Sequence, residues 1–279
     1  MGKRTGLLGI MIVAALGLAA CGTASGQTGS PGVATTAVPT APPGGRATGP
    51  GPAGWGRATA GGAGSRDLAV RPMPPPAPVL PASAHPGDHG KGVVALQRQL
   101  AALGYEVRKV DGQYGPATRH AVVAFQKVNH LSRDGVAGPR TMKALAHPRR
   151  PRPKLGGNGL HLEADLALQV IYVVSGGRIA QILDASSASG GTYRSHGGIH
   201  RAHTPEGSFR IGRKIDGWHR SYLGLMYRPA YFDGPYAIHG AANVPPYPAS
   251  HGCIRVTTAS MDAIYGKLVP DTPVLVYRT

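Results

Sequence analysis

Two stretches of this sequence are too rich in glycine and proline, and too poor in apolar side chains, to contribute to a folded core. Residues 21–88 consist largely of Gly, Pro, Ala, Ser and Thr with scattered Arg, and residues 148–158 form a short, basic, Pro-rich segment. Such composition is typical of flexible linkers and disordered tethers. The remaining sequence after residue 88 therefore divides into two segments that can fold, 89–147 and 159–279.

Residues 89–147 show the periodicity of amphipathic helices. Apolar side chains recur at helical spacing over 93–103 and again over 121–128; a Gly follows the first run and a Gly-Pro pair precedes the second. The sequence D-G-Q-Y-G-P-A-T at 111–118 is echoed by D-G-V-A-G-P-R-T at 134–141. This internal repeat predicts that the same turn opens two helices of one small domain.

Residues 159–279 instead show the short apolar runs of β-strands. Runs over 162–174 and 179–183 are separated by Gly176-Gly177, a pair that predicts a hairpin turn. Further short strands are expected around Phe209 and over 274–277, and one helix over 258–268. This segment is therefore predicted to be mainly β.

The N-terminus has the plan of an export signal. Two basic residues precede an apolar run over 7–18, which is too short to span a bilayer comfortably. The run closes with Leu-Ala-Ala-Cys, which resembles the lipobox of bacterial lipoproteins. The resemblance implies that residues 1–20 are a lipoprotein signal peptide and that Cys21 is acylated as the mature N-terminus, a membrane anchor outside the cytoplasm. The alternative is an ordinary secretory signal with a chance cysteine.

The charge of the chain points toward anionic partners. The formal net charge is +17, which favours nucleic acid, anionic lipid or an acidic cell wall. Nucleic acid is the weakest of these candidates, because no basic recognition helix, zinc-finger spacing or interleaved aromatic pattern accompanies the charge. Much of the excess lies in connecting segments, where solvated basic side chains are the ordinary interpretation.

Cys253 is the candidate nucleophile. It is the second of two cysteines, and it lies in Ser-His-Gly-Cys-Ile-Arg, with His239-Gly240 upstream. A neighbouring imidazole can take the proton of a thiol and leave a reactive ion pair. Gly252 permits a turn that directs backbone N–H groups at a developing oxyanion. For a cysteine without such neighbours, a small buried apolar residue is an equally good interpretation.

Both folding segments resemble known families. The first resembles the peptidoglycan-binding domain type 1 family, a three-helix wall-binding module, through the L-Q to G-Y motif at 96–105, D-G-x-x-G-x-x-T at 111–118 and A-V-x-x-F-Q at 121–126. The second resembles the L,D-transpeptidase catalytic (YkuD) family, through H-G at 239–240, S-H-G-C-I-R at 250–255 and T-P-E-G-S-F-R-I at 204–211. The implied fold is a mainly β catalytic domain, a YkuD-like sandwich or barrel, preceded by the three-helix domain.

The YkuD resemblance implies roles for the motif residues. Cys253 would be the nucleophile, His239 the general base, and the Gly240 carbonyl the group that orients the imidazole. His251, Gly252 and Cys253 would supply oxyanion-hole amides.

Three further residues are substrate-binding candidates. Arg255 would bind a stem-peptide carboxylate or, equally well, fix the loop through backbone carbonyls. Ser250 is better suited to support the loop than to attack the substrate. Tyr236, like Tyr227 and Tyr231, would line the donor groove, although aromatic packing within the strands is the more ordinary interpretation.

The resemblance implies an L,D-transpeptidase that releases D-Ala from a tetrapeptide stem of peptidoglycan and forms 3→3 cross-links, without a cofactor and with sensitivity to carbapenems. An L,D-carboxypeptidase or a protein-to-wall ligase would use the same site. Rivals from other classes are a non-catalytic wall-binding lipoprotein and a zinc wall peptidase. The histidines at 196, 200, 203 and 219 suggest zinc, but their spacing lacks H-E-x-x-H and favours exposed loop histidines, with no metal bound.

Overall fold

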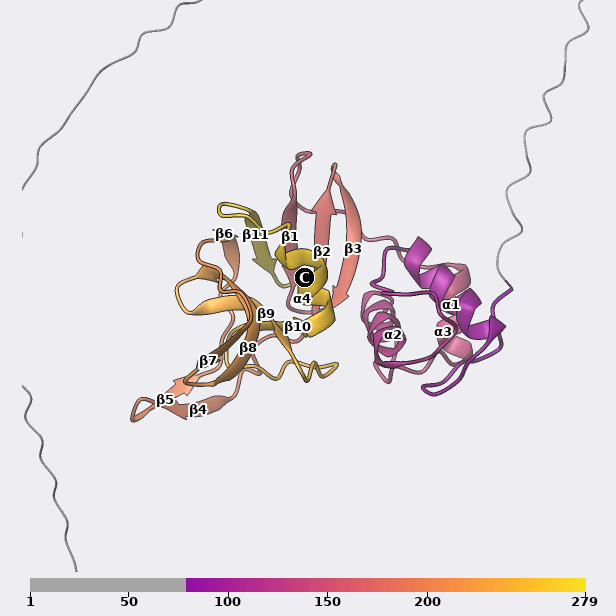
Figure 1. Cartoon of the computed structure of the whole chain (residues 1–279), viewed down its shortest axis with the longest axis horizontal. Helices are drawn as coiled ribbons and strands as arrows, with labels where there is room; N and C mark the ends of the chain where they lie inside the picture. Colours follow the sequence, from indigo (N-terminus) through magenta and orange to yellow (C-terminus); the bar gives the residue numbers. More distant parts are fainter. Residues whose placement is uncertain (1–78) are drawn as a thin grey trace, which may run out of the picture. The chain divides into compact units, whose positions relative to one another are not determined.

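The computed structural model describes residues 79–279 (Figure 1). The predicted signal peptide, Cys21 and most of the predicted tether lie outside the described residues. Within residues 79–279, no helix is both long enough and apolar enough to cross a membrane.

The first folded segment is a three-helix unit, as the sequence predicts. Its helices are α1 (Lys91–Ala102), α2 (Pro116–Val128) and α3 (Pro139–Ala146). A proline occupies the first turn of both α2 and α3, where its missing N–H leaves no intrahelical hydrogen bond unmade. Both helices are thus opened by the repeated Gly-Pro turn.

Two buried glutamines explain the internal repeat. Gln97 donates from Nε2 to Asp111 Oδ1 (3.0 Å) and Thr118 Oγ1 (2.9 Å), and its Oε1 accepts from the Gly112 amide (2.9 Å). Gln126 makes the corresponding bonds one repeat later, to Asp134, Thr141 and Gly135. Each glutamine therefore holds the turn that opens the next helix, with both glycines at positive φ.

The second folded segment is mainly β, also as predicted, and is drawn from pink to yellow in Figure 1. Its elements are β1 (His161–Asp165), β2 (Val170–Ser175), β3 (Arg178–Asp184), β4 (Thr192–Ser195), β5 (Gly198–Arg201), β6 (Gly207–Arg210), β7 (Trp218–Ser221), β8 (Gly224–Asp233), β9 (Tyr236–Ala241), β10 (Ile254–Thr257), α4 (Thr258–Tyr265) and β11 (Pro273–Tyr277). The strands form a five-stranded sheet β3-β2-β1-β11-β6, a four-stranded sheet β10-β9-β8-β7 and the hairpin β4-β5. β9 and β10 run parallel.

Strand β2 is apolar along nearly its whole length because both of its faces are buried. Val170, Tyr172 and Val174 belong to a core shared with the helical unit. Ile171 and Val173 face the opposite way, into the core of the β domain. Alternate residues of a strand point to opposite faces. One strand therefore contributes to two cores and joins the helical unit to the β domain.

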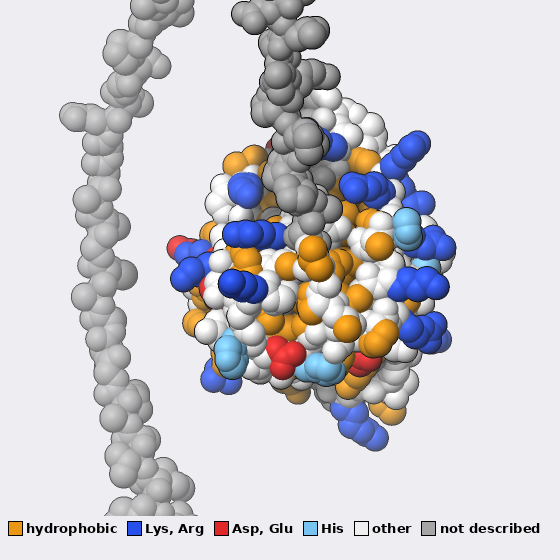
Figure 2. Space-filling view, turned by 90° about the vertical axis from the view of Figure 1, so that its right-hand side faces the viewer, with side chains coloured by type: hydrophobic (Ala, Val, Ile, Leu, Met, Phe, Trp, Pro, Cys, Tyr) orange, Lys and Arg blue, Asp and Glu red, His pale blue; other side chains and the backbone are white. Residues whose placement is uncertain are grey.

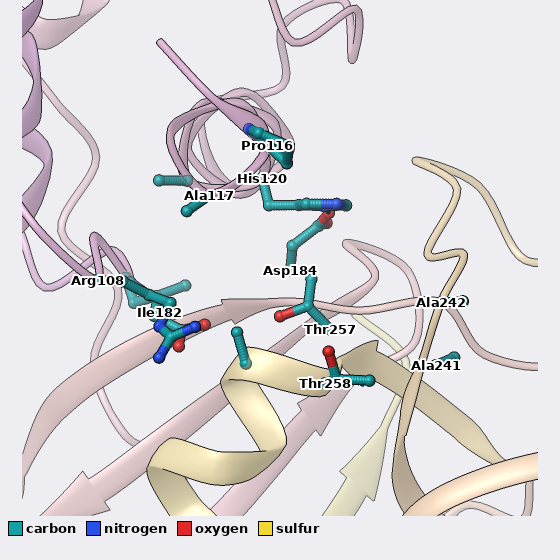
Figure 3. Close-up of a pocket in the computed structure, with 13 residues that line it drawn as sticks. Arg108, Pro116, Ala117, His120, Ile182, Asp184, Ala241, Ala242, Thr257 and Thr258 are labelled. Carbon is teal, nitrogen blue, oxygen red and sulfur yellow. Dashed lines mark hydrogen bonds and ion pairs between the residues drawn. The ribbon is translucent and has the colours of Figure 1, made fainter. Parts of the chain in front are cut away.

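Polar contacts reinforce this junction. The Glu106 amide donates to Ile182 O (3.1 Å), and the Ile182 amide donates to Gly104 O (2.8 Å), so the segment after α1 pairs with β3. Figure 3 shows His120 of α2 facing Asp184 of β3, beside a pocket of about 340 Å³ that the start of α4 also borders. The distance from His120 Nδ1 to Asp184 Oδ2 is 2.7 Å.

Both segments predicted as linkers contact the folded core within the described residues. Ala84 pairs with Ala137 in an isolated β-bridge, so ordered contacts begin before residue 89. In the second segment, the Lys154 and Leu155 amides donate to the buried carboxylate of Glu163. Composition alone gave no sign of these contacts, because backbone amides make them, and these are present in almost any sequence.

Candidate active site

The parallel strands β9 and β10 bring Cys253 and His239 to one face. His239 lies in β9 opposite Arg255 of β10, and Cys253 directly precedes β10. Residues two apart in a strand share a face, so Cys253 lies on the same side as Arg255 and diagonal to His239. The two residues line the same groove.

Hydrogen bonds hold the turn that carries Cys253. Ser250 is 2% exposed, and its hydroxyl donates to Cys253 O (2.5 Å) while accepting from the Gly252 amide (3.1 Å). Thr204 donates from Oγ1 to Gly252 O (2.7 Å) and accepts from the Ala188 amide (3.1 Å). Ser250 therefore supports the loop, and the threonine of the T-P-E-G-S-F-R-I motif acts with it.

Close packing explains the glycines of both catalytic motifs. A Cβ atom at Gly252 would lie 2.5 Å from Tyr236 Cε1 and 2.9 Å from His203 O. One at Gly240 would lie 2.9 Å from Tyr227 Cδ1 and 3.0 Å from Thr258 Cα. Neither glycine has a positive φ, so space and not backbone conformation requires glycine here.

The amides of this turn differ in their availability to an oxyanion. The Gly252 amide is engaged by Ser250 Oγ, so in this conformation it cannot also serve a substrate oxygen. The amides of His251 and Cys253 make no backbone hydrogen bond within residues 79–279. Of the three amides that the sequence predicts for an oxyanion hole, these two are the ones free to act.

A groove of about 640 Å³ surrounds the thiol. Its walls include residues of the β4-β5 hairpin and of β7 and β8. Across the groove Tyr193 packs against His251, with ring centroids 4.6 Å apart, and His196 stacks on Tyr222 at 4.3 Å. A volume of this size is typical of sites that enclose small ligands or peptide segments.

The charge of the groove has one sign. Its charged lining residues are Arg213 and Arg255, and none of its lining residues is Asp or Glu. Four histidines also line it: His196, His200, His239 and His251. The Arg255 guanidinium forms no hydrogen bond to a carbonyl within the described residues, so the loop-fixing role considered for it is not seen. The arrangement is suited to a ligand with carboxylate groups.

The environment of His239 fixes it as a neutral imidazole. Its Nδ1 lies 2.9 Å from Gly240 O, and a carbonyl can only accept, so Nδ1 carries the proton and Nε2 keeps a lone pair. Burial, with a smaller contribution from the nearby charge of Arg255, lowers the pKa of His239 to about 4, against the opposing effect of the Gly240 hydrogen bond. The residue is thus prepared to accept a proton.

The surroundings of the thiol also oppose its ionisation, whereas the sequence led us to expect an ion pair with the imidazole; that pair stays a prediction. Burial raises the pKa of Cys253 above its ordinary value of 9.0, despite the charge of Arg255. With the thiol harder to ionise and the imidazole harder to protonate, both shifts favour an uncharged resting pair. An uncharged pair favours proton transfer during attack on a substrate over transfer before it.

The other predicted residues divide between the groove and its surroundings. Tyr231 and Tyr236 line the groove, whereas Tyr227 donates to Asp262 Oδ1 (2.9 Å) and packs against Gly240. Of the four histidines predicted to lie in exposed loops, His196 and His200 also line it. The loop prediction was wrong for two of them, because His200 lies in β5 and His219 in β7. Within residues 79–279, no group of three or more His, Cys, Asp or Glu side chains is placed to hold a metal ion.

Some site residues were not identified from the sequence. Tyr193 and Arg213 line the groove far from either catalytic motif. Ser187 accepts the Ala249 and Ser250 amides on its carbonyl, both at 2.9 Å. Backbone contacts of this kind leave no mark on side-chain pattern, and only the family motif around Thr204 signalled that this region approaches the site.

A thiol and a basic imidazole on one face of two paired strands, with free amides beside the thiol, are the groups that cysteine-dependent acyl transfer requires. Fold and site therefore define the class as a cysteine acyltransferase. Comparison with known proteins narrows this class. Residues 159–276 match the L,D-transpeptidase catalytic domain (YkuD), and residues 89–145 match the putative peptidoglycan-binding domain.

A solved L,D-transpeptidase structure (residues 123–326) from Xylanimonas cellulosilytica is 45% identical, with a TM-score of 0.68. The alignment covers 72% of this chain and 100% of that one. The chain belongs to the L,D-transpeptidase family.

Two curated relatives from Bacillus licheniformis are also similar over part of the chain. A probable N-acetylmuramoyl-L-alanine amidase is 45% identical over 62 residues, which is 22% of this chain and 18% of the amidase. The N-acetylmuramoyl-L-alanine amidase CwlL is 36% identical over 108 residues, 37% of this chain and 30% of CwlL. The chain spans less than a third of either amidase.

Proposed function

We propose that Cys253 accepts an acyl group from a tetrapeptide stem of peptidoglycan and passes it to the side-chain amine of a diaminopimelate residue, forming a 3→3 cross-link. The observation that carries this proposal is the groove, which joins the thiol and the basic imidazole to arginines and histidines with no acidic side chain. Peptidoglycan stems bear several carboxylates, and a cationic groove favours their binding.

The first stage forms a thioester. Cys253 Sγ attacks the carbonyl carbon of the L,D bond before the terminal D-Ala, and the thiol proton moves to His239 Nε2. The carbonyl oxygen becomes an oxyanion, which the His251 and Cys253 amides stabilise. As the C–N bond breaks, the proton passes from His239 to the departing D-Ala amine.

The second stage resolves the thioester. A diaminopimelate amine attacks the thioester carbonyl, His239 accepts the proton that the amine loses, and the C–S bond breaks with return of a proton to Sγ. Water in place of the amine would give an L,D-carboxypeptidase, and an amine of a protein would give a protein-to-wall ligase. These acceptors share the first stage and differ only in the final product.

Intact-mass measurement tests both stages. Purified full-length protein is incubated with a tetrapeptide muropeptide, and we expect a covalent adduct of the muropeptide minus D-Ala on the wild type but not on Cys253→Ala. The products then identify the acceptor: a cross-linked dimer supports transpeptidation, and a tripeptide alone supports hydrolysis. Turnover that survives Cys253→Ala and is abolished by EDTA would replace the thiol enzyme with a zinc peptidase.

A carbapenem provides an independent probe of the thiol. Its strained lactam carbonyl is an acyl donor, so attack by Cys253 opens the ring without any leaving fragment. A mass increase equal to the whole carbapenem is expected on the wild type. Failure of both the muropeptide and the carbapenem to label Cys253 would support a non-catalytic scaffold.

We further propose that the helical unit docks on the wall while a lipid on Cys21 holds the chain at the membrane. Figure 2 looks onto the side of the molecule where the helical unit lies, and many Lys and Arg side chains are visible there. Exposed basic residues of this unit include Lys91, Arg98, Arg108, Lys109, Arg140 and Lys143. Membrane fractionation of Cys21→Ser tests the anchor; a variant that stays membrane-bound would refute lipidation at this residue.

A further inference from the structure

A buried lysine of the helical unit enters the catalytic domain. Lys127 of α2 has a fully buried side chain. Its ammonium group contacts Asp184 Oδ1 (2.5 Å) and donates to Gln169 O (3.0 Å) and Ala185 O (2.8 Å). A lysine has three N–H donors, and here each has an acceptor on the catalytic domain.

Gln169 connects this lysine to a second segment. It has a φ of +62°, which is uncommon for a residue other than glycine, and its carbonyl accepts from Lys127. Each polar atom of its side chain has a hydrogen-bond partner. Nε2 donates to Leu166 O (2.6 Å) and to Ser187 Oγ (2.7 Å), and Oε1 accepts from the Ser187 amide (2.7 Å). The position of Ser187 therefore depends on Gln169.

Ser187 in turn holds the start of the turn that carries Cys253, residues 249–253, here called the catalytic loop. Its carbonyl accepts from the Ala249 and Ser250 amides. Ser250 then binds Gly252 N and Cys253 O through its hydroxyl. A continuous series of hydrogen bonds thus runs from the helical unit to the residue that carries the thiol.

We propose that Lys127 is a positioning residue of the active site, acting through Gln169 and Ser187 on the catalytic loop at Ser250. The helical unit is then a working part of the enzyme as well as a wall-docking module. Lys127 touches neither thiol nor substrate; its effect is on the placement of the amides beside Cys253. This inference rests on the proposed acyl transfer.

The variants Lys127→Met and Gln169→Asn interrupt the series at two points. Methionine keeps the length of the lysine stem without its ammonium group. Asparagine tolerates positive φ, but its shorter side chain cannot keep the contacts with Ser187. Lys143→Met is the matched control, because it makes the same chemical change at an exposed position of the helical unit.

Two reactions of Cys253 separate positioning from general loosening. Thioester formation with a muropeptide or carbapenem passes through an oxyanion and needs the amides in place, whereas alkylation by iodoacetamide forms no oxyanion. In protein that melts well above the assay temperature, we expect each variant to acylate about tenfold more slowly. The alkylation rate and the final extent of acylation should stay near wild type, and Lys143→Met should match wild type throughout.

The double variant tests the connection itself. If Lys127 acts through Gln169, the double variant should be no slower than the slower single variant, because interrupting one series twice adds nothing. Independent effects, which would give about a hundredfold loss, would overturn the proposal, as would wild-type acylation in a folded Gln169→Asn. Wild-type acylation in a folded Gln169→Asn would refute the proposal even if Lys127→Met does not fold. Absence of acylation in the wild type would instead refute the proposed function.

Discussion

At the scale of single residues, the neutral state of His239 controls how the enzyme responds to pH. A pKa of about 4 leaves the imidazole able to accept a proton throughout the neutral range. We therefore expect the rate of Cys253 acylation to show no inflection near pH 6.5, the ordinary histidine value, and to fall only as pH approaches about 4. Stopped-flow acylation by a carbapenem at a series of pH values measures this; a clear inflection near 6.5 would contradict it.

The same pKa shift predicts a contribution to stability. Between pH 6.5 and about 4 the unfolded chain binds a proton at His239 that the folded chain does not bind. Folding stability should therefore rise with pH across this window, by about 3 kcal/mol from this group, and remain constant above it. The dependence should be weaker in His239→Asn, whose amide can still donate to Gly240 O. Urea unfolding of both proteins at pH 4.5 and pH 7 compares them.

Gly252 lies where a side chain has no room. Gly252→Ala would place a methyl group against the Tyr236 ring and the His203 carbonyl. Overpacking of this kind costs about 1–3 kcal/mol, and it would shift the amides next to Cys253. We expect a lower melting temperature and slower acylation. Gly266→Ala is the control, because its Cβ would meet nothing within 4 Å; equal behaviour of the two variants would refute the steric explanation.

The sequence predicted Cys253 and His239 because their motif is local and specific. It did not predict the protonation of the pair, since burial decides the pKa of each group and burial is set by strands distant in sequence. Burial disfavours the ion pair that the motif led us to expect. The sequence also did not predict that the Gly252 amide donates to the Ser250 hydroxyl, because no sequence pattern specifies the direction of that side chain.

At the scale of elements, the two glutamine-held turns make the helical unit a near-repeat in structure. Gln126→Leu would leave the Gly135 amide and the Thr141 hydroxyl short of a buried partner. Each unsatisfied buried group costs about 1–3 kcal/mol. We expect a lower urea midpoint for this variant and a similar loss for Gln97→Leu; unchanged midpoints would show that the repeat is held by packing alone.

The β4-β5 hairpin forms part of the groove wall through Tyr193, Ser195, His196 and His200. The Tyr193 ring contacts the His251 ring, with centroids 4.6 Å apart. For Tyr193→Ala we expect a higher KM with kcat nearly kept, because the contact shapes the groove and takes no part in proton transfer. Steady-state release of D-Ala measures both constants. A fall in kcat alone would assign Tyr193 to the chemical steps.

At the scale of the whole molecule, periodicity predicted both folded segments and their classes. It could not predict that they share a core, because the alternate residues of β2 that face the helical unit are as apolar as those that face the β domain. The sequence also did not predict the buried contact of Lys127 with Asp184, because a single charged residue on a helix is ordinarily solvent-exposed.

The double-sided burial of β2 bears on how this enzyme can be handled in the laboratory. A shortened protein that starts at residue 148 would leave Tyr172, Val174 and Ile182 without the side chains that cover them. A continuous apolar patch of this kind promotes self-association. Protein used for inhibitor screening should therefore keep the helical unit. Without it, compounds that bind the newly exposed apolar patch would be found together with ligands of the thiol.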